Sequence, residues 1–161
     1  MKAVDNQVEA DWADGRWADA EVGPFLASAV LTPNGRTDKG ITIKLGDDAQ
    51  ATVCFNTELL GYNAAWAGGF LDFKPNRYGL TSWPSPKGNM IFANGNAVGW
   101  AHESSWKDPR ANKRGPLPRH WAKYRGLYRH GKRVALHYSV GDVSVLESPW
   151  AGEAEGQPFL S

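Results

Sequence analysis

The sequence predicts an all-β domain, an antiparallel β-sandwich-like fold with long aromatic- and Pro-rich loops. Apolar residues alternate over short segments, and 18 Gly and ten Pro are spread along the 161 residues. No amphipathic segment exceeds about two helical turns. Many short strands joined by turns are typical of antiparallel folds. The length suits a single domain over residues 1–161, which can bury about 70% of its unfolded surface without a metal or disulfide.

The strands are predicted in order from apolar alternation and turn residues. Residues 1–22 come first and are expected to form an irregular arm. In 40–45, isoleucine and leucine alternate with Thr42 and Lys44, which is typical of a half-buried strand. The expected strands are 25–31, 40–45, 51–55, 62–66, 70–73, 90–92 and the three strands of a C-terminal β-meander at 123–147. Because the sequence ends just after an apolar pair, a further strand is also expected beyond Ser161.

Two proline-containing segments, 74–90 and 93–121, are expected to be mainly loop. A long irregular segment in a compact domain is either functional or a sign of a missed element. Four of the eight Trp residues, at 83, 100, 106 and 121, lie in or beside these loops. The other four, at 12, 17, 66 and 150, lie in segments that look architectural. Only the loop group therefore indicates a binding surface.

Charge is distributed unevenly although the formal net charge is only +1. The first 23 residues are mainly acidic, whereas residues 107–133 hold ten of the 18 Lys and Arg beside a single acid, Asp108. Two interpretations stay open: the acidic segment neutralises the basic one, or the basic stretch is an exposed patch. No recognised nucleic-acid motif accompanies it, so nucleic acid is not an expected partner.

Cys54, the only cysteine, falls in an apolar run and is expected to be buried. An intrachain disulfide and a Cys-x-x-Cys-His haem attachment are thereby excluded. No apolar run is long enough for a membrane span, and the N-terminus lacks the layout of a signal peptide. No cofactor is implied.

No catalytic motif is complete. A Gly-x-Ser-x-Gly elbow and a phosphate-binding glycine loop are both missing. All four histidines lie within 36 positions, but their spacing matches no metal site, so neither a metal nor a catalytic residue is predicted. A small metal-dependent or hydrolytic enzyme using the 102–137 region is kept as an alternative. Its candidate residues are His102, Glu103, His120 and His137.

Binding is the favoured interpretation. Aromatic rings present flat apolar faces on which a sugar chain can stack, and Arg supplies paired donors. We therefore expect a non-catalytic recognition or accessory domain that contacts carbohydrate or another extracellular polymer. A structural or self-assembly domain is the third alternative. The expected ligand-binding residues are Trp83, Trp100, Trp106, Arg110, Arg119, His120 and Trp121.

Several segments also carry a resemblance to a known family. They include 11–17, 22–26, 39–43, 65–71, 115–119 and 124–150. In these segments the chain resembles an uncharacterised N-terminal domain of large exported bacterial proteins that also carry c-type cytochrome and propeller-like modules. The resemblance implies a secreted or periplasmic location, possible neighbouring haem or propeller modules, and polymer binding. It supplies no catalytic residues to transfer.

Overall fold

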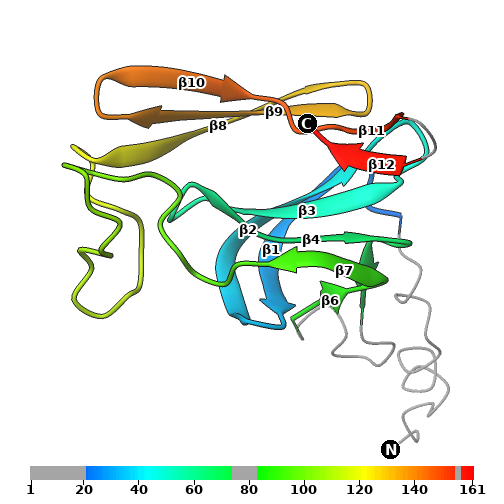
Figure 1. Cartoon of the computed structure of the whole chain (residues 1–161), viewed down its shortest axis with the longest axis horizontal. Coiled ribbons are helices and arrows are strands. Elements are labelled where there is room, and N and C mark those ends of the chain that lie inside the picture. Colours follow the sequence, from blue (N-terminus) through cyan, green and yellow to red (C-terminus); the bar gives the residue numbers. More distant parts are fainter. Residues whose placement is uncertain (1–20, 74–82, 155–156) are drawn as a thin grey trace, which may run out of the picture.

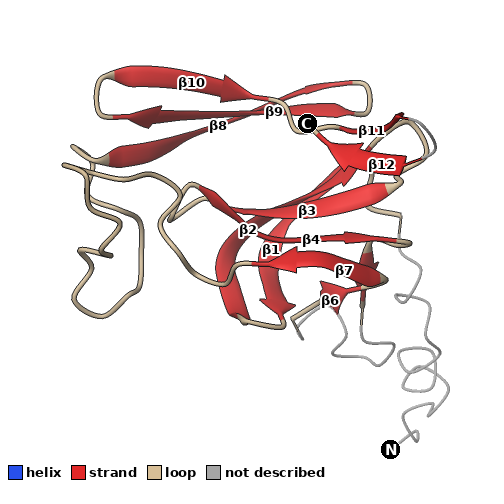
Figure 2. Ribbon diagram, in the orientation of Figure 1, coloured by secondary structure: helices blue, strands red, loops and turns tan. Residues whose placement is uncertain are grey.

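The computed structural model describes residues 21–73, 83–154 and 157–161. Within these ranges the chain forms strands and no helix, and so contains no helix able to cross a membrane (Figure 2). Every strand pairing is antiparallel, which confirms the predicted all-β class. The strands are β1 (Phe25–Thr32), β2 (Gly35–Leu45), β3 (Ala51–Asn56), β4 (Gly61–Ala67), β5 (Leu71–Asp72), β6 (Ser85–Pro86), β7 (Asn89–Ala93), β8 (Ala122–His130), β9 (Arg133–Val140), β10 (Val143–Glu147), β11 (Ala151–Ala154) and β12 (Gln157–Leu160).

Two sheets face each other. The larger has the order β1-β2-β3-β4-β7, and the smaller has the order β10-β9-β8. In Figure 1 the three-stranded sheet lies across one face of the five-stranded sheet, as in a sandwich. The short pairs β5-β6 and β11-β12 complete the arrangement.

The main core fills the space between these sheets. Alternate residues of a strand point to the same face, so Val134, Leu136 and Tyr138 of β9 all point inward and are buried. They share one apolar cluster with Ile43 of β2 and Val53 of β3. Full burial of an aliphatic side chain of this kind contributes about 1.5–3 kcal/mol. This cluster holds the two sheets together.

The opposite face of the large sheet is covered as well. Trp66 and Cys54 are buried there with Leu71 and Phe73, and the burial expected for Cys54 is confirmed. Thr42 pairs with Cys54 across the sheet and is itself fully buried. The prediction of a half-buried strand at 40–45 was therefore wrong, because the segment that follows β4 packs over the face expected to be solvated.

The predicted 93–121 loop and the C-terminal meander are confirmed. Between β7 and β8 the chain has no strand, only an isolated bridge from His102 to Ser105, and this long loop extends from one side of the sandwich (Figure 1). Strands β8, β9 and β10 form the predicted meander, with β9–β10 joined by Gly141, whose φ of 54° suits a tight hairpin turn.

Several differences from the predicted strands remain. Strand β6 and the first residues of β7 lie within the predicted 74–90 loop. The pair β11-β12 was not predicted, because Gly, Glu and Pro interrupt its apolar pattern. The arm over residues 1–20, with Trp12 and Trp17, and most of the predicted 74–90 loop lie outside the described residues. Glu21 and Val22, the end of the predicted arm, have no regular structure.

Candidate binding cleft

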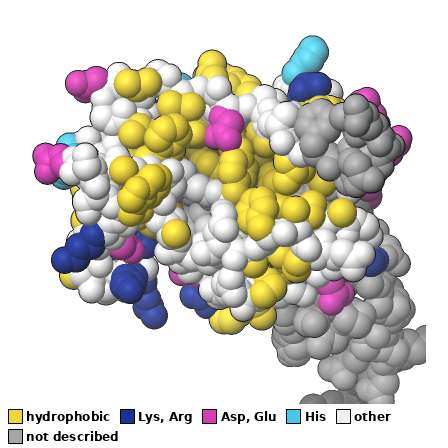
Figure 3. Space-filling model, in the orientation of Figure 1, with side chains coloured by type: hydrophobic (Ala, Val, Ile, Leu, Met, Phe, Trp, Pro, Cys, Tyr) yellow, Lys and Arg dark blue, Asp and Glu magenta, His cyan; other side chains and the backbone are white. Residues whose placement is uncertain are grey.

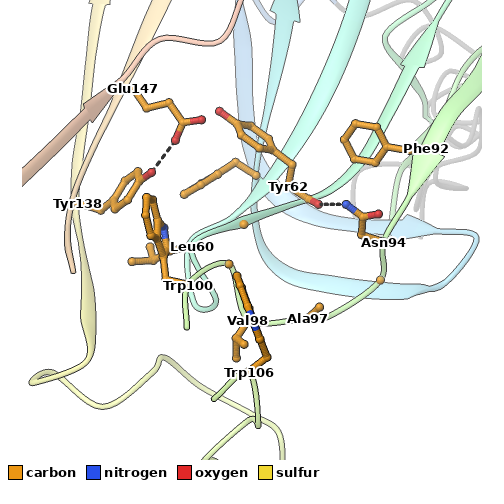
Figure 4. Close-up of a pocket in the computed structure, with 14 residues that line it drawn as sticks. Leu60, Tyr62, Phe92, Asn94, Ala97, Val98, Trp100, Trp106, Tyr138 and Glu147 are labelled. Atoms are coloured by element: carbon orange, nitrogen blue, oxygen red, sulfur yellow. Dashed lines mark hydrogen bonds between the residues drawn. The ribbon is translucent and has the colours of Figure 1, made fainter. Parts of the chain in front are cut away.

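A cleft of about 620 Å³ lies where the long loop meets the space between the two sheets (Figure 4). Its volume is within the range usual for small-molecule sites. Both sheets and the loop contribute to it. The lining residues are Phe55, Leu60, Gly61, Tyr62, Phe92, Asn94, Gly95, Ala97, Val98, Gly99, Trp100, Trp106, Tyr138 and Glu147.

Aromatic rings form much of the cleft wall. Phe55 of β3 contacts the Tyr62 ring of β4 edge to face, with 5.3 Å between centroids, and stacks on Tyr138 of β9 at 5.7 Å. Trp100 packs against Tyr138 from the loop side, at 6.1 Å. These offset and edge-to-face arrangements are the favoured geometries of aromatic pairs. The rings therefore support one another and fix the shape of the cavity.

Among the described residues, Glu147 is the only charged one that lines the cleft. It faces inward because it is two residues beyond Val145, whose side chain packs against the core. Tyr138 donates a hydrogen bond from its hydroxyl to Glu147 Oε2 at 2.6 Å. The Tyr62 hydroxyl points toward the same carboxylate (Figure 4), is buried, and makes no hydrogen bond of normal geometry with a described residue.

The two phenols stay protonated at neutral pH. Burial raises the pKa of Tyr62 well above its usual value, and the nearby Glu147 charge raises it further. The pKa of Tyr138 is raised in the same way, by burial first and then by its hydrogen bond to Glu147. Both hydroxyls therefore keep their protons. Tyr138 donates its proton to Glu147, and the Tyr62 hydroxyl can still donate to a ligand.

Asparagines fasten the first part of the long loop to the large sheet. Asn96 donates from Nδ2 to the carbonyl of Arg36 at 2.9 Å, and its Oδ1 accepts from Asn63 at 2.8 Å and from Asn56 at 3.2 Å. Asn94 donates to the Tyr62 carbonyl at 3.2 Å (Figure 4). These bonds fix the backbone that leads into the cleft wall.

Close backbone packing continues at Gly99. A Cβ placed on Gly99 would lie only 1.8 Å from the carbonyl oxygen of Leu60, so only glycine fits. Its N–H also donates to the Leu59 carbonyl at 2.8 Å. This contact holds the start of the Trp100 segment against β4. The Trp121 indole then donates to the Trp100 carbonyl at 3.2 Å.

A second, smaller cavity of about 170 Å³ adjoins the first. The two share Tyr62, Phe92 and Glu147 in their linings. From there the smaller cavity continues to Pro149 and Trp150. Glu147 therefore lies between an aromatic region with Trp100 and Trp106 and another with Trp150.

Comparison with protein families gives one match. Residues 53–147 match the family described as "Domain of unknown function (DUF6797)", which is more than half of the chain. The chain belongs to this family. The matched segment of the DUF6797 domain contains every residue that lines the larger cleft. No curated protein and no solved structure matches the chain.

Of the four loop tryptophans that we expected to bind a ligand, two line the cleft of this DUF6797 domain and two do not. Trp100 and Trp106 line the cleft and are 37% and 64% exposed. Trp83 is also exposed but does not line it, since its ring packs under the Arg36 guanidinium at 4.1 Å. Trp121 is only 4% exposed and belongs to the main core. Its ring therefore offers no face for stacking, because it closes the core beneath the loop.

The three polar residues of the predicted site do not line the cleft either. Arg110 is bound by both oxygens of Asp108, with 2.9 Å from Nη2 to Oδ2, and also donates to the Gly115 carbonyl. It ties the loop to itself. His120 is exposed and lies near the His102 ring, with centroids 5.6 Å apart, and Arg119 is exposed. Apart from Arg110, the Lys and Arg residues of 107–133 are exposed.

The histidines of the enzyme alternative are not gathered at one point. His137 stacks on Tyr128 and contacts the Ser144 hydroxyl at 3.0 Å, on the face of β9 that points away from the core. In the described part of the chain, no group of three or more His, Cys, Asp or Glu side chains could hold a metal ion.

Sequence reasoning missed four important cleft residues: Tyr62, Phe92, Tyr138 and Glu147. One signal was present. Val143, Val145 and Glu147 occupy alternate positions of a short strand, so the carboxylate shares the face of Val145. A charged residue on such a face is seldom fully buried unless it is paired. Tyr62 and Phe92 gave no comparable signal, because inward-facing aromatics are usual in a sandwich core.

Proposed function

We propose that this protein is a recognition domain that binds carbohydrate in the inter-sheet cleft. One observation carries the proposal: a cavity walled by aromatic rings contains a small set of converging polar groups around Glu147. Small-ligand sites commonly have this composition, with apolar contact supplying affinity and a few polar groups fixing orientation. A sugar has both an apolar C–H face and hydroxyl groups, and so matches both parts of the wall.

Trp100 and Trp106 are the stacking residues of this proposal. They lie in the cleft, retain substantial exposure, and are held by a loop that the asparagine contacts fasten to the sheet. Glu147 accepts hydrogen bonds from sugar hydroxyls, while Asn94 can donate or accept. Trp100 and Trp106 are the two ligand-binding residues expected from the sequence that line the cleft. An extracellular polysaccharide remains the expected ligand, on the basis of the family resemblance.

A titration tests the proposal. Soluble neutral and anionic oligosaccharides are added to the intact protein while tryptophan fluorescence and heat of binding are followed. We expect saturable binding of at least one sugar, weakened tenfold or more by Trp106→Ala. Trp83→Ala is the matched control, because Trp83 is exposed but lies outside the cleft, and it should leave affinity unchanged.

Two outcomes would contradict the proposal. One is the absence of saturable binding by every sugar tested. The other is loss of affinity in Trp83→Ala while Trp106→Ala binds normally, which would place the site on another surface.

A further inference from the structure

The charge of the cleft is negative and is not balanced within it. Among the described residues that line the two adjoining cavities, Glu147 is the only one with a charged side chain. Arg110, the least exposed cation of the basic stretch, is already paired with Asp108. The exposed cations at 107–133 do not line either cavity. One of them, Arg133, packs its guanidinium on the ring of Trp150, at 3.9 Å from the ring centroid.

The surroundings of Glu147 strengthen this charge. Glu147 is half-buried, and its carboxylate faces the neutral hydroxyls of Tyr138 and Tyr62 (Figure 4). Charges interact more strongly where aromatic groups displace water. In Figure 3 hydrophobic side chains cover the centre of one face of the molecule with an acidic side chain among them, while the basic side chains visible there lie nearer its margin.

The aromatic walls of the cleft, like Glu147, favour a positively charged ligand. Aromatic rings present negative faces, so a cation beside Trp or Tyr is stabilised. Trp100, Trp106, Tyr62 and Tyr138 all line the larger cavity with Glu147. A protonated amine thus meets a carboxylate and aromatic rings together, whereas the acidic group of a uronic acid or sulfated sugar would be repelled by Glu147.

We propose that the ligand of this cleft is an amino sugar, or a chain of amino sugars, whose protonated amine binds Glu147 while its ring stacks on Trp100 or Trp106. This inference rests on the proposed carbohydrate-binding function and narrows it to one class of ligand. The position of Glu147 between the two cavities allows a chain to extend on either side of the bound amine.

The test compares three β-1,4-linked oligomers of equal length, made of glucosamine, N-acetylglucosamine or glucose. Binding to the intact protein is measured calorimetrically at low salt and at a pH where the amine is protonated. We expect the glucosamine oligomer to bind at least tenfold more tightly than the two neutral oligomers. This preference should shrink as salt is added and as the pH is raised enough to deprotonate the amine.

Glu147→Gln should abolish the preference and leave binding of the neutral oligomers nearly unchanged, because the amide retains the shape and an acceptor for Tyr138. Glu103→Gln is the matched control. It removes an exposed negative charge from the same loop as Trp106 without touching the cleft, and should preserve the preference. The salt and pH series on the unmodified protein test the inference independently if Glu147→Gln folds poorly.

The outcomes separate the two proposals. Equal affinity for all three oligomers, or a preference that survives in Glu147→Gln, overturns the amino-sugar inference and leaves carbohydrate binding standing. Failure of every oligomer and polysaccharide to bind overturns both. Equally tight binding of a simple diamine such as cadaverine would show a site for cations in general, and would also overturn the amino-sugar inference.

Discussion

Trp121 and Trp106 look alike in the sequence, but replacing them should change the stability of the protein by very different amounts. Trp121 is 4% exposed within the main core, whereas Trp106 is 64% exposed in the cleft. A tryptophan buries up to about 250 Å², and at roughly 25 cal/mol per Å² its burial contributes up to about 6 kcal/mol. Because the site can partly collapse, Trp121→Ala should lower the free energy of unfolding by about 3–5 kcal/mol. Trp106→Ala should change it by less than about 0.5 kcal/mol.

Part of the Trp121 effect comes from its hydrogen bond to the Trp100 carbonyl. Trp121→Phe keeps most of the ring volume and removes this donor. It should therefore cost less than the alanine variant, with about 1 kcal/mol of the loss due to the hydrogen bond. It should also weaken ligand binding, because the Trp100 backbone loses one of its supports.

Urea denaturation followed by far-ultraviolet circular dichroism measures these effects. The midpoint should shift while the slope with denaturant stays constant, since a change of slope would indicate altered compactness. The reasoning is refuted if Trp121→Ala costs less than about 1 kcal/mol, or if Trp106→Ala costs as much as Trp121→Ala.

Three further predictions concern other contacts. Asn96→Ala should lower the free energy of unfolding by about 1–3 kcal/mol, because Asn63 and Asn56 lose a hydrogen-bond acceptor. Urea denaturation measures this loss. Asn94→Ala should cost less, and equal losses in the two variants would contradict this account. Arg110 lowers the pKa of Asp108. The ion pair should therefore stabilise the fold at pH values above the ordinary pKa of Asp, and this stabilisation should be lost as the pH falls below it. The stability of Asp108→Asn should depend less on acid pH, and an unchanged acid profile would contradict this account. Burial raises the pKa of Cys54 from 9.0 to about 11, so the protein should become less stable as the pH rises through that interval. This loss of stability should be smaller in Cys54→Ala. Rapid labelling of the native protein by a thiol reagent at neutral pH would contradict the burial of Cys54.

Local sequence pattern determined much of the sandwich. The alternation of Val134, Leu136 and Tyr138 fixed which side of β9 faces the core, and glycine-containing turns limited the strands around it. The long irregular stretch before β8 was also predicted, since proline and the loss of periodicity act locally. The prediction that strand 40–45 is half-buried was wrong, because the burial of Thr42 depends on a distant segment that covers the sheet.

The binding site could be predicted only in part. The sequence by itself determined that tryptophans occur in the long loop, and two of them, Trp100 and Trp106, reach the cleft. Only the tertiary structure decided that Trp121 is buried and that Tyr62 and Glu147 meet, although they are far apart along the chain. A strand pattern specifies the face on which a side chain lies, but not which strand of the opposite sheet faces it. That choice is made by packing between the sheets, and it creates the cleft.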